Sequence, residues 1–162
     1  MGIRIITDST SDISTKQAAK MDIKIVPLKV IFGDKEYKEG IDITIEGFYE
    51  KLVKADSLPT TSQPAPDEFL NYFNEAKAAG DSVIVMVIAS ELSGTYQSAM
   101  IAKEIAEYDK IHIIDSKTTT TALRLLVEEA VKLRDDGYEA EDIVGKLMDL
   151  KDRIVLLAMV DT

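Results

Sequence analysis

A chain of 162 residues, 46% of them apolar, is long enough to bury one hydrophobic core, so its length predicts a single domain. It has no cysteine and one histidine, which excludes disulfides and a cysteine–histidine zinc cluster, and we expect no metal. The formal net charge of −10 argues against nucleic acid as a partner, because phosphate binding needs a basic face.

No apolar run approaches membrane-spanning length, and the N-terminus leads directly into a predicted strand rather than a secretory signal. We therefore expect a cytoplasmic protein without a membrane span. That first strand is Ile3–Thr7, and the polar loop Asp8–Asp12 follows it. Ser14 and Gln17 have the spacing of a capping box, which predicts a helix. The polar groups of the loop either bind a ligand or only bond the local backbone, as Asx and Ser/Thr turns do.

The next segment predicts a hairpin and a helix. Residues Ile23–Phe32 form a second extended stretch, in which Pro27 marks a bulge, an edge or a strand start. A turn then leads to a returning hairpin arm at Glu36–Lys38. Thr44 is placed to cap a helix over Ile45–Ala55.

A proline-rich segment, Asp56–Pro66, follows this helix. Its three prolines exclude a helix and a central strand there. Pro66 suits the first position of a helix that Gly80 ends. The prolines therefore hold a loop at a helix N-terminus that contains three polar residues, Thr61, Ser62 and Gln63. This loop is either a binding element or a plain connector.

The centre of the chain, Ser82–Ala106, predicts a strand, a loop and a helix. Seven consecutive apolar residues, Val83–Ala89, are typical of a strand buried on both faces of a parallel sheet. The loop Ser90–Thr95 leads into an amphipathic helix. One side of that helix is expected to carry the apolar residues Ala99, Met100, Ala102, Ile105 and Ala106.

Such a unit offers free backbone N–H groups and the positive end of a helix to an anion. The hydroxyls of Ser93 and Thr95 add donors, and Gly94 lets a ligand approach the backbone closely. The alternative interpretation is that Ser93 or Thr95 only caps the helix.

A further strand, Lys110–Ile114, contains His112 and ends at Asp115-Ser116. A histidine in the middle of a strand is more often a core or face residue than a catalytic one, because catalytic groups favour loops. The threonines Thr118–Thr121 come next. The remaining elements are predicted to be helices at Ala122–Leu133 and Ala140–Leu150 and a last strand at Ile154–Val160.

Together these elements predict an α/β fold, a three-layer sandwich with a mostly parallel sheet. Three loops rich in Ser and Thr follow strands, and the carboxyl ends of parallel strands share one edge, so these loops should converge. The chain has no glycine-rich nucleotide loop, so we expect no cofactor. Lys117 is almost the only basic residue in these loops. Hydroxyl and N–H groups without cations suit a carboxylate better than a phosphate dianion.

In four segments the sequence resembles the DegV family. They are Thr7–Asp12 (TDSTSD), Thr61–Pro64 (TSQP), Ser90–Ala99 (SELSGTYQSA) and Ile114–Ser116 (IDS). The resemblance implies binding of a long-chain fatty acid and, for some members, a role as the acyl-carrying subunit of bacterial fatty acid kinase. On that basis the chain is expected to be no enzyme itself, with catalysis left to the partner kinase.

The resemblance also implies a ligand site. It places the fatty acid carboxylate between Thr61 and Ser62 on one side and Ser93 and Gly94 on the other, with the tail between apolar core elements. Secondary contacts are expected from Asp8, Ser9, Thr10, Gln63, Thr95, Ser116 and Arg124.

The sequence departs from the family pattern at two places. After Asp115-Ser116 the family usually has a serine and then Gly-x-Gly, where this chain has Thr120, Ala122 and Arg124. Arg124 in a glycine position either enters the pocket, where it narrows the space or supplies a new cation, or it points to solvent. The family also continues into a second domain, so residues 1–162 are expected to be the N-terminal domain of a two-domain protein, with weak binding or self-association when alone.

Two alternatives remain at the level of the sequence. The first is an enzyme or binding protein for a small phosphorylated or hydroxy-acid ligand, working through Asp8, Ser93 or Asp115. The second is a structural or regulatory half-domain without a ligand.

Overall fold

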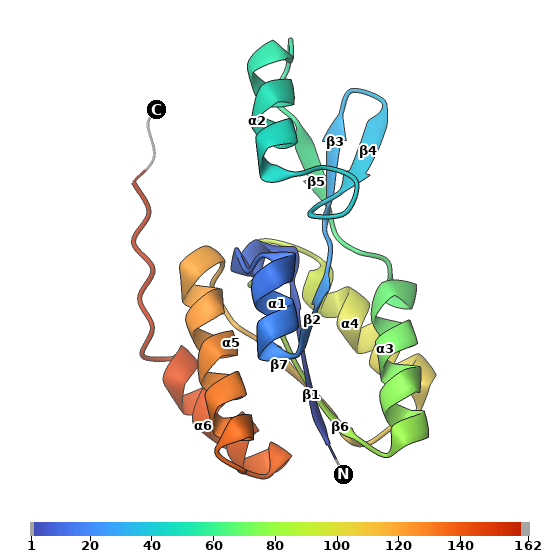
Figure 1. Ribbon diagram of the computed structural model, residues 1–162, viewed down its shortest axis with the longest axis vertical. Helices are drawn as coiled ribbons and strands as arrows, with labels where there is room; N and C mark the ends of the chain where they lie inside the picture. The colour runs from blue at the N-terminus through green and yellow to red at the C-terminus, as the bar shows by residue number, and fades with distance from the viewer. Residues whose placement is uncertain (1, 160–162) are drawn as a thin grey trace.

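Four parallel strands form the central sheet of the computed structural model, which describes residues 2–159 (Figure 1). Their order across the sheet is β2-β1-β6-β7, and every pair is parallel. All six residues of β6 are buried, as expected for a strand covered on both faces. The four strands are β1 (Ile3–Asp8), β2 (Ile23–Val26), β6 (Ser82–Val87) and β7 (Ile111–Asp115).

Helices cover both faces of this sheet, which confirms the three-layer α/β prediction. On one face lie α3 (Pro66–Ala79) and α4 (Thr95–Ala106), packed on a core that includes Phe69 and Phe73. On the other face lie α1 (Thr15–Met21), α5 (Thr120–Asp135) and α6 (Ala140–Lys151) (Figure 1). The Ser14–Gln17 capping box before α1 forms as predicted.

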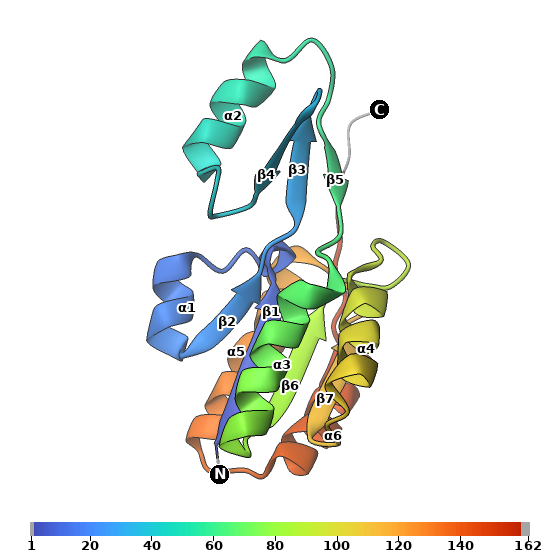
Figure 2. The same ribbon diagram turned by 90° about the vertical axis from the view of Figure 1, so that its right-hand side faces the viewer.

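A small lobe stands above the carboxyl ends of the parallel strands (Figure 2). It contains an antiparallel sheet in the order β4-β3-β5 and one helix. The chain enters the lobe through Pro27-Leu28 and leaves it through residues 63–65. The elements of the lobe are β3 (Lys29–Phe32), β4 (Lys35–Lys38), α2 (Ile45–Lys54), which Thr44 caps as predicted, and β5 (Thr60–Ser62).

The lobe corrects two predictions. The extended stretch Ile23–Phe32 is divided between two sheets, because Pro27 lacks the N–H group that a continuous strand would need. Residues Thr60–Ser62 are a short edge strand rather than irregular chain. The flanking prolines permit this, since they lie just outside the three paired residues.

Two further predictions are wrong. Ile105 is 56% exposed, whereas the buried residues of α4 are Thr95, Ser98, Ala99, Ala102 and Ala106. The last strand expected at Ile154–Val160 does not form within residues 154–159, and Val160 lies outside the described residues. A strand needs a partner edge, and this described segment pairs with none of the sheet strands.

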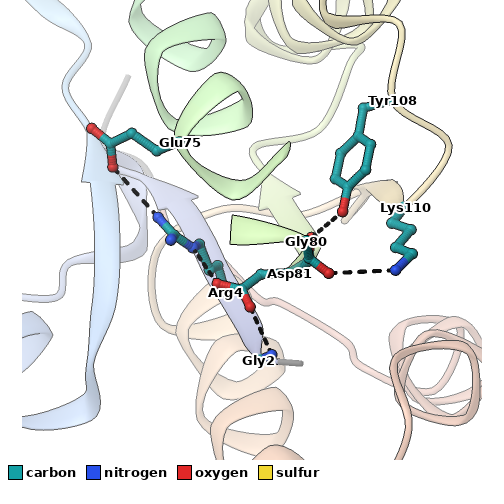
Figure 3. Close-up of polar contacts among 7 residues, drawn as sticks. All are labelled: Gly2, Arg4, Glu75, Gly80, Asp81, Tyr108 and Lys110. Atoms are coloured by element: carbon teal, nitrogen blue, oxygen red, sulfur yellow. Dashed lines mark hydrogen bonds and ion pairs between the residues drawn. The ribbon is translucent and has the colours of Figure 1, made fainter. Parts of the chain in front are cut away.

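At the amino ends of the parallel strands, Asp81 anchors the start of β1 (Figure 3). Its carboxylate accepts a hydrogen bond from the backbone N–H of Gly2 at 2.7 Å and one from Arg4 Nε at 3.0 Å. Arg4 also reaches Glu75 of α3 at 3.4 Å. The Tyr108 hydroxyl donates to the Asp81 carbonyl at 2.9 Å. This network ties together segments that lie far apart in the sequence.

No helix among residues 2–159 is both long enough and apolar enough to cross a membrane.

Candidate functional site

The three polar loops meet at the carboxyl edge of the parallel sheet, as predicted. The Ile88 N–H donates to Asp8 Oδ2 at 2.7 Å, which joins the ends of β1 and β6. The Ser90 hydroxyl donates to Asp115 Oδ2 at 2.5 Å, and the Ala89 N–H donates to the Thr118 carbonyl at 2.8 Å. These hydrogen bonds join the loops, which come from segments up to 80 residues apart.

Asp8 holds these loops together. It is fully buried, and its other oxygen, Oδ1, accepts from both the N–H and the hydroxyl of Thr10, at 2.8 and 2.6 Å. Burial raises the pKa of the Asp8 carboxyl above its ordinary value, against the opposing effect of these hydrogen bonds. The local-turn interpretation is therefore incomplete, because the bond from Ile88 is long-range.

Asp115 has the same role between β7 and the neighbouring loops. Burial pulls its pKa upward, but hydrogen bonds from Ser90 and the Lys117 N–H outweigh burial and hold the pKa below the ordinary value. The Ser90 N–H and the Lys117 N–H both donate to Oδ1 at 3.1 Å. The oxygens of Asp8 and Asp115 are thus used for loop structure, which does not favour the alternative in which they do chemistry.

The N-terminus of α4 has no side-chain cap. Gly94 is the N-cap residue, so neither Ser93 nor Thr95 occupies that position, but Ser93 Oγ still accepts a hydrogen bond from the Thr95 N–H of the first turn, which bears out the capping interpretation in part. The hydroxyls of Ser93 and Thr95 lie 2.9 Å apart and bond each other, and the Thr95 N–H lies 3.3 Å from Ser93 Oγ. Thr95 is fully buried, whereas Ser93 and Gly94 are partly exposed. The first turn of a twelve-residue helix therefore leaves N–H groups available to an anion.

Gly94 also brings two predicted site segments together. A Cβ atom built on Gly94 would lie 2.6 Å from Gln63 Nε2 and 2.7 Å from its Oε1. The Gly94 backbone has φ −72° and ψ 7°, which any residue can adopt, so space and not conformation requires glycine here. The Gln63 amide lies directly against the start of α4, although the two residues are 31 positions apart.

The register of the lobe sheet separates Thr61 from Ser62. Thr61 pairs with Val30, and Ser62 pairs with Lys29, so their side chains lie on opposite faces. The hydroxyls of Thr61 and Ser62 therefore do not lie on the same side of β5.

Most of the expected secondary contacts are occupied within the protein. Ser9 Oγ donates to Glu39 at 2.6 Å and accepts from the Leu28 N–H at 2.9 Å. The buried Ser116 hydroxyl donates to the Thr118 carbonyl at 3.1 Å. Arg124 Nε donates to Glu128 of its own helix at 2.7 Å and remains partly exposed.

His112 lies in mid-strand on β7, as predicted, three residues before the site edge. Its Nε2 is 3.9 Å from Glu141 Oε1, which is too long for a hydrogen bond. Among residues 2–159, no three His, Cys, Asp or Glu side chains are grouped so that they would hold a metal ion.

A cavity of about 550 Å³ lies elsewhere, between α2 of the lobe and the segment around α1. Ser9 is the one predicted site residue that lines it. Sequence reasoning missed this cavity, although the spacing of Ile45 and Tyr49, one helical turn apart, was a signal for an apolar helix face.

The fold and these loops define an α/β protein whose polar loops gather at the carboxyl edge of a parallel sheet. A family model described as "Uncharacterised protein, DegV family" matches residues 2–162. A DegV domain-containing protein of Clostridium perfringens is 37% identical over 152 residues, which cover 94% of this chain and 54% of that protein. The chain belongs to the DegV family, and it spans about half the length of the curated relatives it matches.

Solved structures show the same fold. A stearic acid-binding protein of Eubacterium ventriosum has a TM-score of 0.84 at 34% identity, over 91% of this chain and 52% of that one. DegV of Bacillus subtilis, described as a fatty acid-binding protein, has a TM-score of 0.85 at 33% identity, over 94% and 54%. A fatty acid-binding DegV family protein of Thermus thermophilus has a TM-score of 0.85 at 30% identity, over 94% and 54%.

Proposed function

We propose that this chain binds the carboxylate of a long-chain fatty acid at the N-terminus of α4. The carboxylate accepts hydrogen bonds from the Gly94 region of the backbone and from the hydroxyls of Ser93 and Thr61. Ser62 contributes through its backbone, because its side chain points to the other face of β5. The single observation that carries this proposal is the contact of Gln63 with Gly94, which brings the two polar segments to one uncapped helix end.

Two further facts support a fatty acid over other anions. Solved relatives with the same fold are described as fatty acid-binding proteins, one of them for stearic acid. The residues around Gly94 supply hydroxyl and N–H donors, and Arg124 of α5 is paired with Glu128. A singly charged carboxylate suits such a site, whereas a phosphate dianion usually attracts Arg or Lys.

We further propose that the chain presents the bound fatty acid to a separate kinase and contributes positioning rather than chemistry. The kinase would transfer the γ-phosphoryl group of ATP to the carboxylate oxygen, which yields an acyl phosphate and ADP. In this proposal residues 1–162 act as the N-terminal domain of a two-domain protein, and the tail lies between apolar elements.

Native mass spectrometry of the purified chain, followed by lipid extraction, tests the binding proposal. We expect one co-purified long-chain acyl group per chain, or binding of added stearate in titration calorimetry. A Ser93→Ala, Thr61→Ala variant should lose at least tenfold in affinity, while a Ser57→Ala variant at an exposed position outside the polar loops should not. The absence of both a co-purified acyl chain and calorimetric binding would overturn the proposal.

The presentation step has its own assay. With the catalytic subunit of a bacterial fatty acid kinase, stearate and Mg-ATP, acyl phosphate should form only when this chain is present. Fatty acid binding without any acyl phosphate would reject presentation and leave the binding proposal intact.

A further inference from the structure

A groove separates the lobe from the core on the side of α1 and α2. Figure 2 shows α2 standing above α1, and the cavity of about 550 Å³ lies between the segments that flank them. Its walls are mainly apolar and come from both parts of the fold. They include Ile13 and Ile25 of the core and Val30, Ile43 and Phe48 of the lobe.

The apolar lining continues onto the exposed face of α2. Ile45 and Tyr49 line the cavity and are still 71% and 59% exposed. Val53 follows one turn later and is 86% exposed. Spacing of four residues puts all three side chains on one face of the helix. A contiguous exposed apolar surface of this kind typically marks an interaction site.

The charged residues that line the groove have one sign. Asp12, Glu39 and Glu46 line it, and none of the described residues in the lining is Lys, Arg or His. Glu39 is held in place by the 2.6 Å hydrogen bond from Ser9. Lys51 of α2 lies 5.0 Å from the centre of the Tyr37 ring and is not part of the lining.

We propose that this groove docks a basic amphipathic helix of a partner protein. The apolar side chains of that helix enter the cavity between α1 and α2, in the way that helices occupy apolar grooves. Its flanking Lys and Arg residues lie against Asp12 and Glu46, which also raises the rate of encounter. The acidic lining disfavours a fatty acid carboxylate, so this surface is separate from the proposed fatty acid site at Gly94.

Fluorescence anisotropy with two designed helical peptides tests the proposal. Both peptides carry Leu at i, i+3, i+4 and i+7; one has Lys and Arg at the flanking positions, and the other has Glu. We expect the basic peptide to bind the whole chain at least tenfold more tightly than the acidic one. A Tyr49→Ser, Val53→Ser variant should weaken that binding at least tenfold. The matched control is Leu125→Ser, at a 54% exposed apolar residue of α5.

Charge reversal separates docking from general attraction to an acidic protein. Glu46→Lys should weaken binding of the basic peptide more than Glu104→Lys does. Glu104→Lys makes the same change of charge at an exposed residue of α4. Equal losses for groove and control variants would overturn the proposal. Displacement of the peptide by stearate would also overturn it, by assigning the groove to the acyl chain. Concentration-dependent dimerisation that Tyr49→Ser abolishes would assign the groove to a second copy and reject a partner helix.

Discussion

Gly94 shows how one residue sets the shape of the candidate site. Its backbone angles are ordinary, so alanine would be tolerated there on conformational grounds. The restriction is the Gln63 amide, which occupies the space of a side chain. The Gln63 amide lies at the end of a flexible side chain, so it can move away at a modest cost to stability. A substitution of Gly94 should therefore affect ligand binding more than stability.

We predict that Gly94→Ala lowers affinity for stearate at least tenfold, or about 1.4 kcal/mol, with little change in Tm. The reason is that the new Cβ displaces Gln63 and narrows the approach to the N–H groups of α4. Titration calorimetry measures the affinity. Gly145→Ala is the matched control, because its Cβ would meet nothing within 4 Å.

Combining Gly94→Ala with Gln63→Ala removes the steric conflict and should restore part of the affinity. If Gly94→Ala binds stearate as tightly as the parent chain, the carboxylate does not lie at this helix end.

The Asp81 carboxyl makes the stability of the protein depend on pH. The Gly2 N–H, and then the hydrogen bond from Arg4, hold the pKa of the Asp81 carboxyl below its ordinary value (Figure 3). A carboxyl with a lowered folded pKa stabilises the protein above its unfolded pKa of about 3.9 and loses that effect as the pH falls through the folded pKa.

We therefore predict that Asp81→Asn lowers the free energy of unfolding at pH 7 and that its difference from the parent chain shrinks below about pH 4. Urea unfolding at several pH values measures this. Asp109→Asn, at an exposed carboxyl, serves as control. A difference that is constant between pH 7 and pH 3 would show that the carboxylate charge is not responsible.

At the scale of elements, the edge strand β5 determines which polar side chains face the site. Consecutive strand residues point to opposite faces, so two neighbouring hydroxyls cannot serve one ligand equally. The pairing with β3 decides between them, because it puts Thr61 beside Val30 and Ser62 beside Lys29.

We predict that Thr61→Ala weakens stearate binding by about 1–3 kcal/mol, the cost of losing a hydrogen bond to a charged group. Ser62→Ala should have a smaller effect, since its hydroxyl lies on the other face. Calorimetry on the two single variants gives the comparison. Equal losses would mean that β5 pairs in a different register when ligand is bound.

The lobe helix α2 is held less firmly than the helices of the core. It has no fully buried residue, whereas α3 buries Phe69, Phe73 and Ala76. Helix stability in proteins comes mainly from packing of the apolar face, and segments with few buried contacts open locally.

Native-state hydrogen exchange should therefore show amides of α2 exchanging faster than those of α3 by at least tenfold. Binding of the basic helical peptide in the groove should slow exchange in α2 and leave α3 unchanged. Equal protection of the two helices in the free chain would contradict the inference of a weakly held lobe.

At the scale of the whole molecule, residues 154–159 leave an apolar strip in solvent. Val155, Leu157 and Met159 are 79%, 89% and 100% exposed. Three large apolar side chains so close together favour association with another surface.

We predict that the chain self-associates through this strip and that Val155→Ser, Leu157→Ser, Met159→Ser shifts it toward the monomer in analytical ultracentrifugation. Ile105→Ser, Leu125→Ser is the control at exposed apolar positions outside this strip. A strict monomer that binds stearate tightly with 1:1 stoichiometry would show that this chain encloses the tail unaided.

Local patterns in the sequence determined most of the elements. The apolar run at Val83–Ala89 predicted a doubly covered strand, and the Ser14–Gln17 spacing predicted the start of α1. These features depend on backbone hydrogen bonds and side-chain periodicity within a few residues, which is why they are visible without a structure. The convergence of the three polar loops also followed, because parallel strands end at one edge.

Only the tertiary structure decided which surfaces meet. The contact of Gln63 with Gly94, the opposite faces of Thr61 and Ser62, and the groove beneath α2 each depend on how the lobe is placed on the core. The exposed strip after α6 is equally a tertiary outcome, because an apolar run becomes a strand only where a partner edge is free to pair with it. Such contacts join residues far apart in the chain, and local periodicity carries no information about them.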